Sequence, residues 1–261
     1  MSQPLDLGRL GAWGHLDSLP IDEARAYARR VQELAYGTLW VAETAGREPF
    51  TQLGLLAGET TELNLGTSIV GIWGHDAQTT RMAAMTLQEA TGGRFVLGLG
   101  VSHLHLAQKL RGHTYERPLT RMREFLAAYR AARYLGPTSE GAAEPPVLLA
   151  ALREGMASLA ATDADGAFPY LVTPQRVAWM RDVMDRAAKE AGREQRPLLA
   201  VTLASVLETD PDAARGRRRA SARPIGRHPP AIAWSMPWSP GGTQTRCRAA
   251  SASWWRQAPT M

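Results

Sequence analysis

The sequence predicts an α/β fold, a TIM (β/α)8-type barrel that is incomplete, with about seven βα units followed by an irregular C-terminal tail. Three observations predict it. Short apolar segments typical of buried parallel strands alternate with segments of helical periodicity. The chain has 261 residues, close to the roughly 250 that an eight-unit barrel needs. The composition also changes abruptly after residue 212.

The clearest strand is the apolar segment from Arg94 to Val101, which is followed by Ser102 and His103. Such a run is typical of a strand that is buried on both faces, as in parallel sheets. Polar residues at its carboxyl end lie where parallel α/β folds bind ligands. The segment is not a dinucleotide-binding fingerprint, because Gly98 and Gly100 lie inside the strand and no third glycine follows.

The remaining units follow in order along the chain. Each expected helix has apolar residues at helical spacing, and the helix that begins at Pro174 has Thr173 as its capping residue. The expected strands are 8–15, 38–43, 63–70, 94–101, 147–152, 166–172 and 198–207; the expected helices are 21–34, 50–57, 77–90, 119–135, one that carries Met156 and Leu159, 174–191, and one that opens at 210–213.

The composition indicates a soluble, cytoplasmic protein. Hydrophobic residues make up 44% of the chain, and no apolar segment is long enough to span a membrane. The N-terminus lacks the pattern of a signal peptide, and the single cysteine, Cys247, excludes an intramolecular disulfide framework. Because the chain contains no G-x-S-x-G motif, a hydrolase is not expected.

The formal net charge of +5 comes from the C-terminal tail. Residues 213–261 hold nine arginines and no Asp, Glu or Lys, which leaves residues 1–212 with a net charge of −4. We therefore divide the chain into a barrel domain, 1–212, and a basic Pro/Trp/Arg-rich tail, 213–261, which we expect to be disordered or translated out of frame.

A frameshift would account for the missing eighth βα unit. Back-translation of the tail into another frame can give an acidic segment followed by an amphipathic one, and the alternative is a genuine basic arm. A barrel that lacks its eighth unit would expose sheet edges and apolar surface, so poor solubility is expected.

Six segments, in this order, resemble the luciferase-like monooxygenase superfamily: GRLGAW, GTLWVAETAGREPF, LNLGTSIVGIW, GRFVLGLGVSH, RPLTRMREFL and ADGAFPYLVTP. The resemblance covers about residues 8–213 and is closest to the oxidoreductases that depend on coenzyme F-420 (F420). It implies a TIM barrel, a deazaflavin or flavin cofactor at the carboxyl-terminal mouth, and a dimer.

The resemblance implies roles for residues that follow the second and third strands. Glu43 would be a catalytic residue that faces the cofactor or substrate; alternatively it caps its loop or pairs with Arg47. Thr67, Ser68 and Ile69 would bind the cofactor at a bulge that in relatives often contains a non-proline cis peptide, although an ordinary strand end is the alternative.

Further candidates lie on the loops after the third and fourth strands. Trp73 would form a wall for the cofactor ring or anchor its own loop. His75 has the near-neutral pKa that suits proton donation, and the alternative is a solvated loop histidine. Gly100 and Ser102 are expected to contact the cofactor, and His103 is the third expected catalytic residue.

Three histidines in eleven residues (103, 105 and 113) could suggest a metal site. No cysteine or carboxylate near them completes a ligand set, so no metal is expected.

After the fifth strand, relatives carry a glycine-rich turn whose amides hold the cofactor phosphate at a helix N-terminus. This chain has Arg153, Glu154 and Gly155 there, so Arg153 and Gly155 are the expected phosphate-binding residues. Glu154 is unfavourable for an anion, which leaves the choice between F420 and FMN open.

The expected function is F420-dependent hydride transfer to or from a small organic substrate. One alternative is an FMN-dependent luciferase-like monooxygenase that uses O2. Another is an inactive barrel whose basic tail binds nucleic acid or other acidic partners; outside that alternative, nucleic-acid binding is not expected. The expected partners are a small-molecule substrate, a second copy of the chain, and a flavin or F420 reductase.

Overall fold

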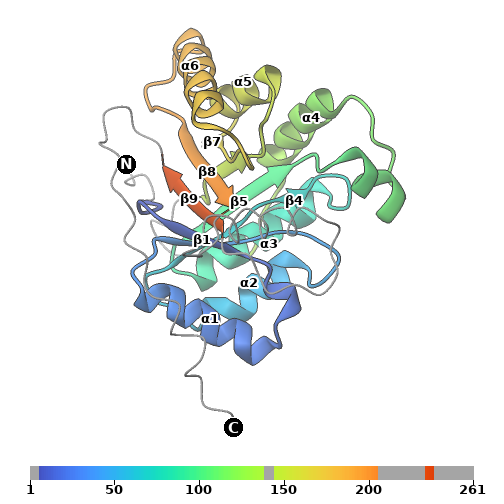
Figure 1. Ribbon diagram of the computed structural model, residues 1–261. Coiled ribbons are helices and arrows are strands. Elements are labelled where there is room, and N and C mark those ends of the chain that lie inside the picture. The colour runs from blue at the N-terminus through green and yellow to red at the C-terminus, as the bar shows by residue number, and fades with distance from the viewer. Residues whose placement is uncertain (1–5, 138–143, 205–232, 238–261) are drawn as a thin grey trace.

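The strands of this protein pair edge to edge into a closed ring (Figure 1). The computed structural model describes residues 6–137, 144–204 and 233–237. The strand order is β3-β2-β1-β9-β8-β7-β6-β5, and a pairing between β5 and β3 closes the ring. The strands are β1 (Gly11–Gly14), β2 (Thr38–Val41), β3 (Asn64–Thr67), β4 (Val70–Gly71), β5 (Phe95–Gly100), β6 (Val147–Leu149), β7 (Gly166–Ala167), β8 (Leu198–Ala204) and β9 (Ala233–Pro237).

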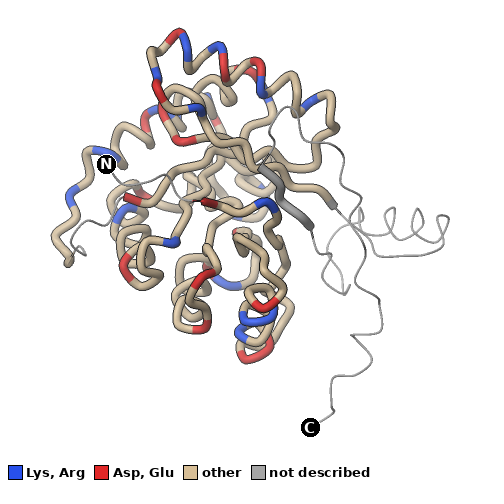
Figure 2. Tube along the Cα trace, turned by 90° about the vertical axis from the view of Figure 1, so that its left-hand side faces the viewer, with Lys and Arg blue, Asp and Glu red and all other residues tan. Residues whose placement is uncertain are grey.

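Helices cover the outside of this ring, as Figure 1 shows. Basic and acidic residues are interspersed along them (Figure 2). Pro174 begins α6 and the Thr173 side chain accepts a hydrogen bond from the Arg176 N–H, so the predicted cap is confirmed. The helices are α1 (Ile21–Glu33), α2 (Pro49–Ala57), α3 (Ala77–Ala90), α4 (Pro118–Ala131), α5 (Glu154–Thr162) and α6 (Pro174–Glu190).

The core has an inner and an outer part. Alternate residues of each strand point to opposite faces, so one set packs under the helices and the other fills the ring. Residues from strands on opposite sides of the ring meet only inside it. This inner cluster consists of Leu7, Trp13, Trp40, Val96, Leu148, Phe168 and Ala200.

The predicted barrel is confirmed. The position of the eighth strand, which was expected to be missing, is filled by β9. The tail was expected to be irregular, but within it β9 lies between β1 and β8 and runs antiparallel to both. An eighth βα unit would place a parallel strand there. The free backbone groups of β1 and β8 explain the pairing, because a strand of either direction can satisfy them.

The predicted third strand is interrupted. It forms β3 and β4, and the peptide bond between Ser68 and Ile69 is cis, as the resemblance implies. The loop after β5 contains a π-helical turn, Leu106–Leu110. The expected helix that opens at 210–213 lies outside the described residues.

No helix in the described part of the chain is both long and apolar enough to cross a membrane.

Candidate active site

The inner face of the barrel at the carboxyl ends of the strands is formed by aromatic and hydroxyl side chains. The Trp13 indole N–H lies 3.4 Å from the Ser68 carbonyl oxygen, to which it donates a hydrogen bond. The ring centroids of Trp13 and Tyr170 are 5.8 Å apart. Thr202 of β8 shares the inner face with Ala200, two residues before it. Residues of β1 and β8 and of the segments that follow β3 and β7 therefore meet at this mouth.

Small residues of β5 and of the loop that follows β6 form the opposite wall. A Cβ atom added to Gly100 would lie 2.6 Å from the Ile69 side chain and 3.0 Å from the Ala150 Cβ atom. The absence of side chains at Gly98 and Gly100 therefore lets Ile69 lie flat against β5. Ile69 thus gives the mouth an apolar surface at the position where the resemblance places a cofactor ring.

Two hydroxyl groups at this mouth lack partners in the described part of the chain. Ser68 is 9% exposed and Thr202 is 0% exposed. Neither the Ser68 Oγ atom nor the Thr202 Oγ1 atom has a hydrogen-bond partner among the residues that the structure describes. A buried hydroxyl without a partner is unfavourable, so these atoms fit a ligand that offers donors or acceptors. A planar ring with polar edges offers such groups.

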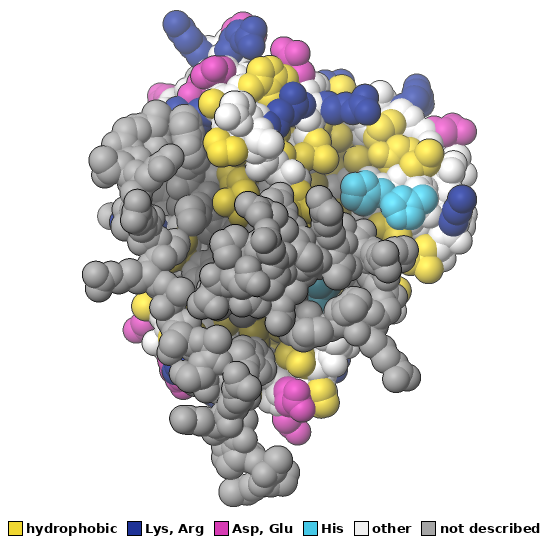
Figure 3. Space-filling view, in the orientation of Figure 1, with side chains coloured by type: hydrophobic (Ala, Val, Ile, Leu, Met, Phe, Trp, Pro, Cys, Tyr) yellow, Lys and Arg dark blue, Asp and Glu magenta, His cyan; other side chains and the backbone are white. Residues whose placement is uncertain are grey.

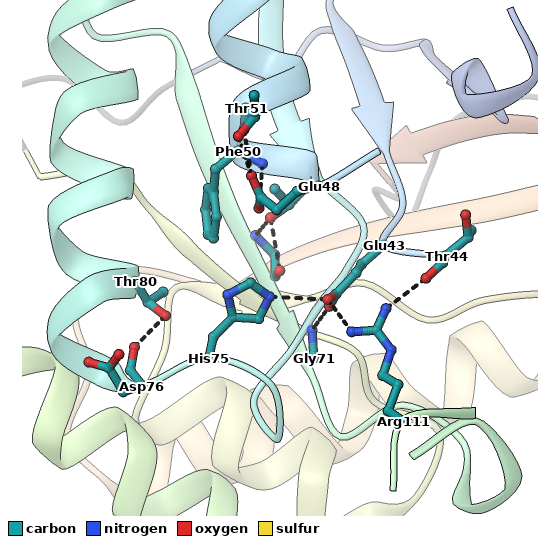
Figure 4. Close-up of polar contacts among 12 residues, drawn as sticks. Glu43, Thr44, Glu48, Phe50, Thr51, Gly71, His75, Asp76, Thr80 and Arg111 are labelled. Carbon is teal, nitrogen blue, oxygen red and sulfur yellow. Dashed lines mark hydrogen bonds and ion pairs between the residues drawn. The ribbon is translucent and has the colours of Figure 1, made fainter. Parts of the chain in front are cut away.

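Glu43 is the centre of a polar network beside this mouth (Figure 4). Its Oε2 atom accepts a hydrogen bond from the Gly71 N–H at 2.6 Å, and its Oε1 atom lies 3.1 Å from His75 Nε2. Arg111 donates to the same Oε1 atom and, at 2.7 Å, to the Thr44 carbonyl oxygen. Glu43 therefore pairs with Arg111 and His75, and ties the loops after β2, β4 and β5 together.

The network sets the protonation of both titratable partners. Burial of the Glu43 carboxylate would raise its pKa, but hydrogen bonds from His75, Gly71 and Arg111 outweigh burial and hold the pKa below its ordinary value. The hydrogen bond to Glu43 raises the pKa of His75, although burial opposes this effect. Glu43 is therefore ionised at neutral pH and is not available as an acid.

Glu43 and His75 also lie on the outer side of the barrel wall. In β2, Trp40 belongs to the inner cluster and Val41 to the outer core, and this alternation puts Glu43 on the outer side. The His75 ring packs edge-on against Phe50 of α2, with centroids 5.8 Å apart. These two predicted catalytic residues are thus brought together, but beside the mouth instead of inside it.

Trp73 anchors its loop to the loop after β5. Its indole N–H donates to the Val101 carbonyl oxygen at 2.7 Å, and its ring lies 5.2 Å from that of Tyr115. A cavity of about 340 Å³ lies beside it, lined by Trp73, His113, Thr114, Glu116, Arg117, Thr120, Arg121 and Glu124.

Ser102 and His103 separate after β5. Ser102 has a φ of 56° and approaches Gly71, because a Cβ atom added to Gly71 would lie 4.0 Å from that of Ser102. His103 is exposed and stacks on His105 at 5.9 Å. Figure 3 shows histidine and hydrophobic side chains next to each other on this face. His103 is therefore not part of the Glu43 network.

Arg153 and Gly155 lie at the start of α5, as expected. Arg153 is exposed, is close enough to Tyr115 to act on its pKa, and forms no ion pair with a described carboxylate. A Cβ atom added to Gly155 would lie 2.9 Å from the Leu119 side chain, so this glycine also allows α5 to approach α4. Among the residues with described positions, no group of three or more His, Cys, Asp or Glu could hold a metal.

Sequence reasoning missed Trp13, His15, Arg111, Tyr170 and Thr202. Trp13 and His15 could have been found by the rule that selected Ser102 and His103, because they lie at the carboxyl end of a predicted strand. Thr202 could have been found because it lies between Val201 and Leu203 in a predicted apolar strand, where a hydroxyl is expected to be buried. Arg111 had no signal, because it lies in a loop without periodicity.

Known proteins match most of the chain. The profile of the family described as luciferase-like monooxygenase matches residues 4–255. A Mycobacterium tuberculosis protein, named for coenzyme F420-dependent oxidoreductase activity, is 27% identical over 247 residues, which are 82% of this chain and 70% of that protein.

Two solved structures share the fold. The coenzyme F420-dependent tetrahydromethanopterin reductase of Methanopyrus kandleri superposes with a TM-score of 0.67 at 18% identity, covering 79% of this chain and 68% of that one. An F420-dependent secondary alcohol dehydrogenase in complex with an F420-acetone adduct gives a TM-score of 0.65 at 15% identity, covering 73% of this chain and 67% of that one. This chain spans about two thirds of the length of these proteins. The extent of the profile match shows that the chain belongs to the luciferase-like monooxygenase family.

Proposed function

We propose that this protein is an oxidoreductase that binds coenzyme F420 in the mouth of the barrel and transfers hydride to or from a small organic substrate. The observation that carries the proposal is that the buried hydroxyls of Ser68 and Thr202, beside Trp13 and Tyr170, have no partner among the residues that the structure describes. The relative from M. tuberculosis and both solved structures are named for F420-dependent enzymes, which supports the choice of cofactor.

Each wall of the mouth has a role in this proposal. Ser68 and Thr202 would hydrogen-bond to the polar edge of the deazaflavin, and Ile69 would support its face with the help of Gly100. Arg153 and the N-terminus of α5 would hold the phosphate. When bound, the deazaflavin supplies a ring carbon that accepts or gives hydride. The chain itself would position the substrate carbon and exclude water.

An FMN-dependent monooxygenase is the second candidate, because the matching family profile is described as luciferase-like monooxygenase. Both cofactors have a planar three-ring system, so the same hydroxyls would serve either of them. For both candidates we expect a small-molecule substrate and a reductase that supplies reduced cofactor, and we expect the chain to form a homodimer.

Two substitutions separate a ligand-binding role of the hydroxyls from a structural one. Ser68→Ala and Thr202→Val remove hydroxyls without described partners, so the free energy of unfolding should stay within about 1 kcal/mol of wild type or rise. Affinity for the cofactor should fall about tenfold, as expected for one lost hydrogen bond. The two quantities are measured by chemical unfolding and by fluorescence titration with F420.

Thr38→Val is the matched control. The Thr38 hydroxyl is buried at the opposite end of β2 and donates to the Leu7 carbonyl oxygen at 2.7 Å. This variant should lose about 1 to 2 kcal/mol of stability and keep its affinity for the cofactor. If Ser68→Ala and Thr202→Val bind F420 as tightly as wild type, the proposed site is wrong.

A further inference from the structure

The segment that carries Ser68 and Ile69 holds one residue more than the strand beside it. The paired residues on its two sides are Gly66 with Val96 and Val70 with Leu99. Three residues, 67–69, therefore oppose the two residues 97–98 of β5. Such an extra residue forms a β-bulge, which interrupts the backbone hydrogen bonds between two strands and redirects side chains. Ser68 and Ile69, which line the mouth, both belong to this bulge.

The Thr67 hydroxyl makes the two hydrogen bonds that the bulge interrupts. The ladder is regular at Leu65, whose N–H donates to the Arg94 carbonyl oxygen at 2.9 Å. If it continued, the Gly98 N–H would donate to the Thr67 carbonyl oxygen, and the Gly98 carbonyl oxygen would accept from the Ile69 N–H. Instead, the Gly98 N–H donates to Thr67 Oγ1 at 2.8 Å, and Thr67 Oγ1 donates to the Gly98 carbonyl oxygen at 2.9 Å. One side-chain hydroxyl thus replaces a whole step of the ladder.

The surroundings of this hydroxyl make threonine and glycine the residues that fit. Thr67 is 0% exposed, so water does not reach its hydroxyl. A valine at position 67 would have the same shape, but it would leave both backbone groups of Gly98 without this partner. A Cβ atom added to Gly98 would collide with the Thr67 carbonyl oxygen. Gly98 therefore allows the bulge to approach β5, and Thr67 fastens it there.

The other side of the bulge is bonded to the end of β2 and the residues that follow it through backbone groups. The Ser68 N–H donates to the Val41 carbonyl oxygen at 2.8 Å, and the Ile69 carbonyl oxygen accepts from the Glu43 N–H at 3.3 Å. Any residue could make these bonds. The connection to β5 differs, because it uses the side chain of Thr67 and is lost when that side chain is replaced.

We propose that Thr67 is a positioning residue of the cofactor site. Its hydroxyl holds the bulge against β5 and thereby places the Ser68 hydroxyl and the Ile69 side chain for the deazaflavin ring, without contacting the ring itself. A hydroxyl has one hydrogen to donate, and Thr67 donates it to Gly98. The inference rests on the proposed function.

The first test needs no cofactor. It compares Thr67→Val, which removes the hydroxyl, with Thr67→Ser, which keeps it, and with Thr38→Val, the same substitution at another buried threonine. NMR of the full chain follows the Ile69 δ1 methyl and the Trp13 indole N–H, assigned by their loss in Ile69→Val and Trp13→Phe.

Thr67→Val should shift both resonances, because the indole N–H donates to the Ser68 carbonyl oxygen. Thr67→Ser and Thr38→Val should shift neither. Unshifted resonances in Thr67→Val would overturn the inference. Melting temperatures show that each variant is folded, and Thr67→Ala replaces Thr67→Val if the latter does not fold.

The second test is fluorescence titration with F420. Thr67→Val should lower the affinity at least as much as Ser68→Ala, about tenfold or more. Thr67→Ser should bind within threefold of wild type, and Thr38→Val should keep its affinity. The double variant Thr67→Val/Ser68→Ala should bind no more than threefold more weakly than Thr67→Val, because Thr67 acts through Ser68. Losses that multiply would mean that Thr67 acts independently of Ser68, and would overturn the inference.

The outcomes separate the two proposals. If wild type binds no F420, the proposed function fails and this inference fails with it. If wild type binds F420 and Thr67→Val binds it equally tightly, only the inference about Thr67 is wrong. If Thr67→Val and Thr38→Val lose the same affinity, lower stability is the cause of the loss, and the inference about Thr67 is again wrong.

Discussion

Glu43, for which the resemblance implies a catalytic role, is also held in a network that connects loops. Three donors, on Gly71, His75 and Arg111, surround its carboxylate, which is only 10% exposed. A carboxylate held in this way connects three loops whose ends meet at the mouth. Its negative charge therefore stabilises the loops on which the site depends.

Glu43→Gln should lower the free energy of unfolding by about 1 to 3 kcal/mol, because it leaves buried donors with a weaker acceptor. Chemical unfolding at neutral pH measures the change. Glu89→Gln is the control, since Glu89 is exposed and should change stability by less than about 0.5 kcal/mol. Equal stability of Glu43→Gln and wild type would contradict the structural role.

The contribution of the Glu43 and His75 pair should depend on pH in both directions. The lowered pKa of Glu43 contributes stability that is present above the ordinary carboxyl pKa and lost as pH falls through the lowered value. The raised pKa of His75 contributes stability that is present below the ordinary histidine pKa and lost as pH rises through the raised value.

The stability difference between wild type and His75→Gln should therefore be largest between about pH 4.3 and 6.5, the ordinary pKa values of the two groups. It should shrink toward higher pH, where His75 loses its proton. Unfolding measured across this range tests the prediction. A difference that is constant from pH 5 to pH 9 would contradict it.

At the level of elements, the barrel wall depends on close contacts between strands. A Cβ atom added to Gly66 of β3 would lie 2.5 Å from the buried Trp40 ring of β2. Gly66→Ala should therefore cost about 1 to 3 kcal/mol, because Trp40 would have to leave its position in the inner cluster.

Gly58→Ala is the matched control for Gly66→Ala. Gly58 follows α2 with a φ of −77°, and a Cβ atom there would meet nothing within 4 Å. This variant should be as stable as wild type or up to about 1 kcal/mol more stable, because alanine restricts the unfolded chain. If both variants lose the same stability, packing against Trp40 is not the cause.

The sequence predicted the elements better than the contacts between them. Apolar periodicity located α1, α3 and β5, because burial decides both the pattern and the element. It did not separate inner from outer residues at strand ends, and the expectation that Glu43 and His75 face the mouth came from the resemblance and from the barrel topology; their catalytic roles stay a prediction. It also missed Arg111, whose partners are 67 and 68 residues away in the chain.

At the level of the whole molecule, β9 connects the two ends of the parallel sheet. It pairs with β1 through Gly11, Ala12 and Trp13, and with β8 from Ala200 to Ala204. Apolar periodicity did not predict this strand, because pairing with two free edges depends on backbone groups that every sequence offers. The frameshift hypothesis remains a prediction about the nucleotide sequence, and reading that sequence in all frames tests it.

Truncation of the chain after residue 232 should open the ring between β1 and β8. The amide hydrogens of β1 should then exchange with solvent faster, and the exposed edges should promote aggregation. Hydrogen exchange measured on the full and truncated chains tests this, with the amides of β6 as an internal control. Unchanged protection in β1 would contradict a closing role for β9.

The central claim is that the mouth of this barrel is a site for F420, and calorimetric titration of the full chain with F420 and, separately, with FMN tests it most directly. We predict saturable binding of F420 with micromolar or tighter affinity and at least tenfold weaker binding of FMN. Tighter binding of FMN would replace hydride transfer by oxygen chemistry as the proposed function. Binding of neither cofactor by a folded sample would contradict the account.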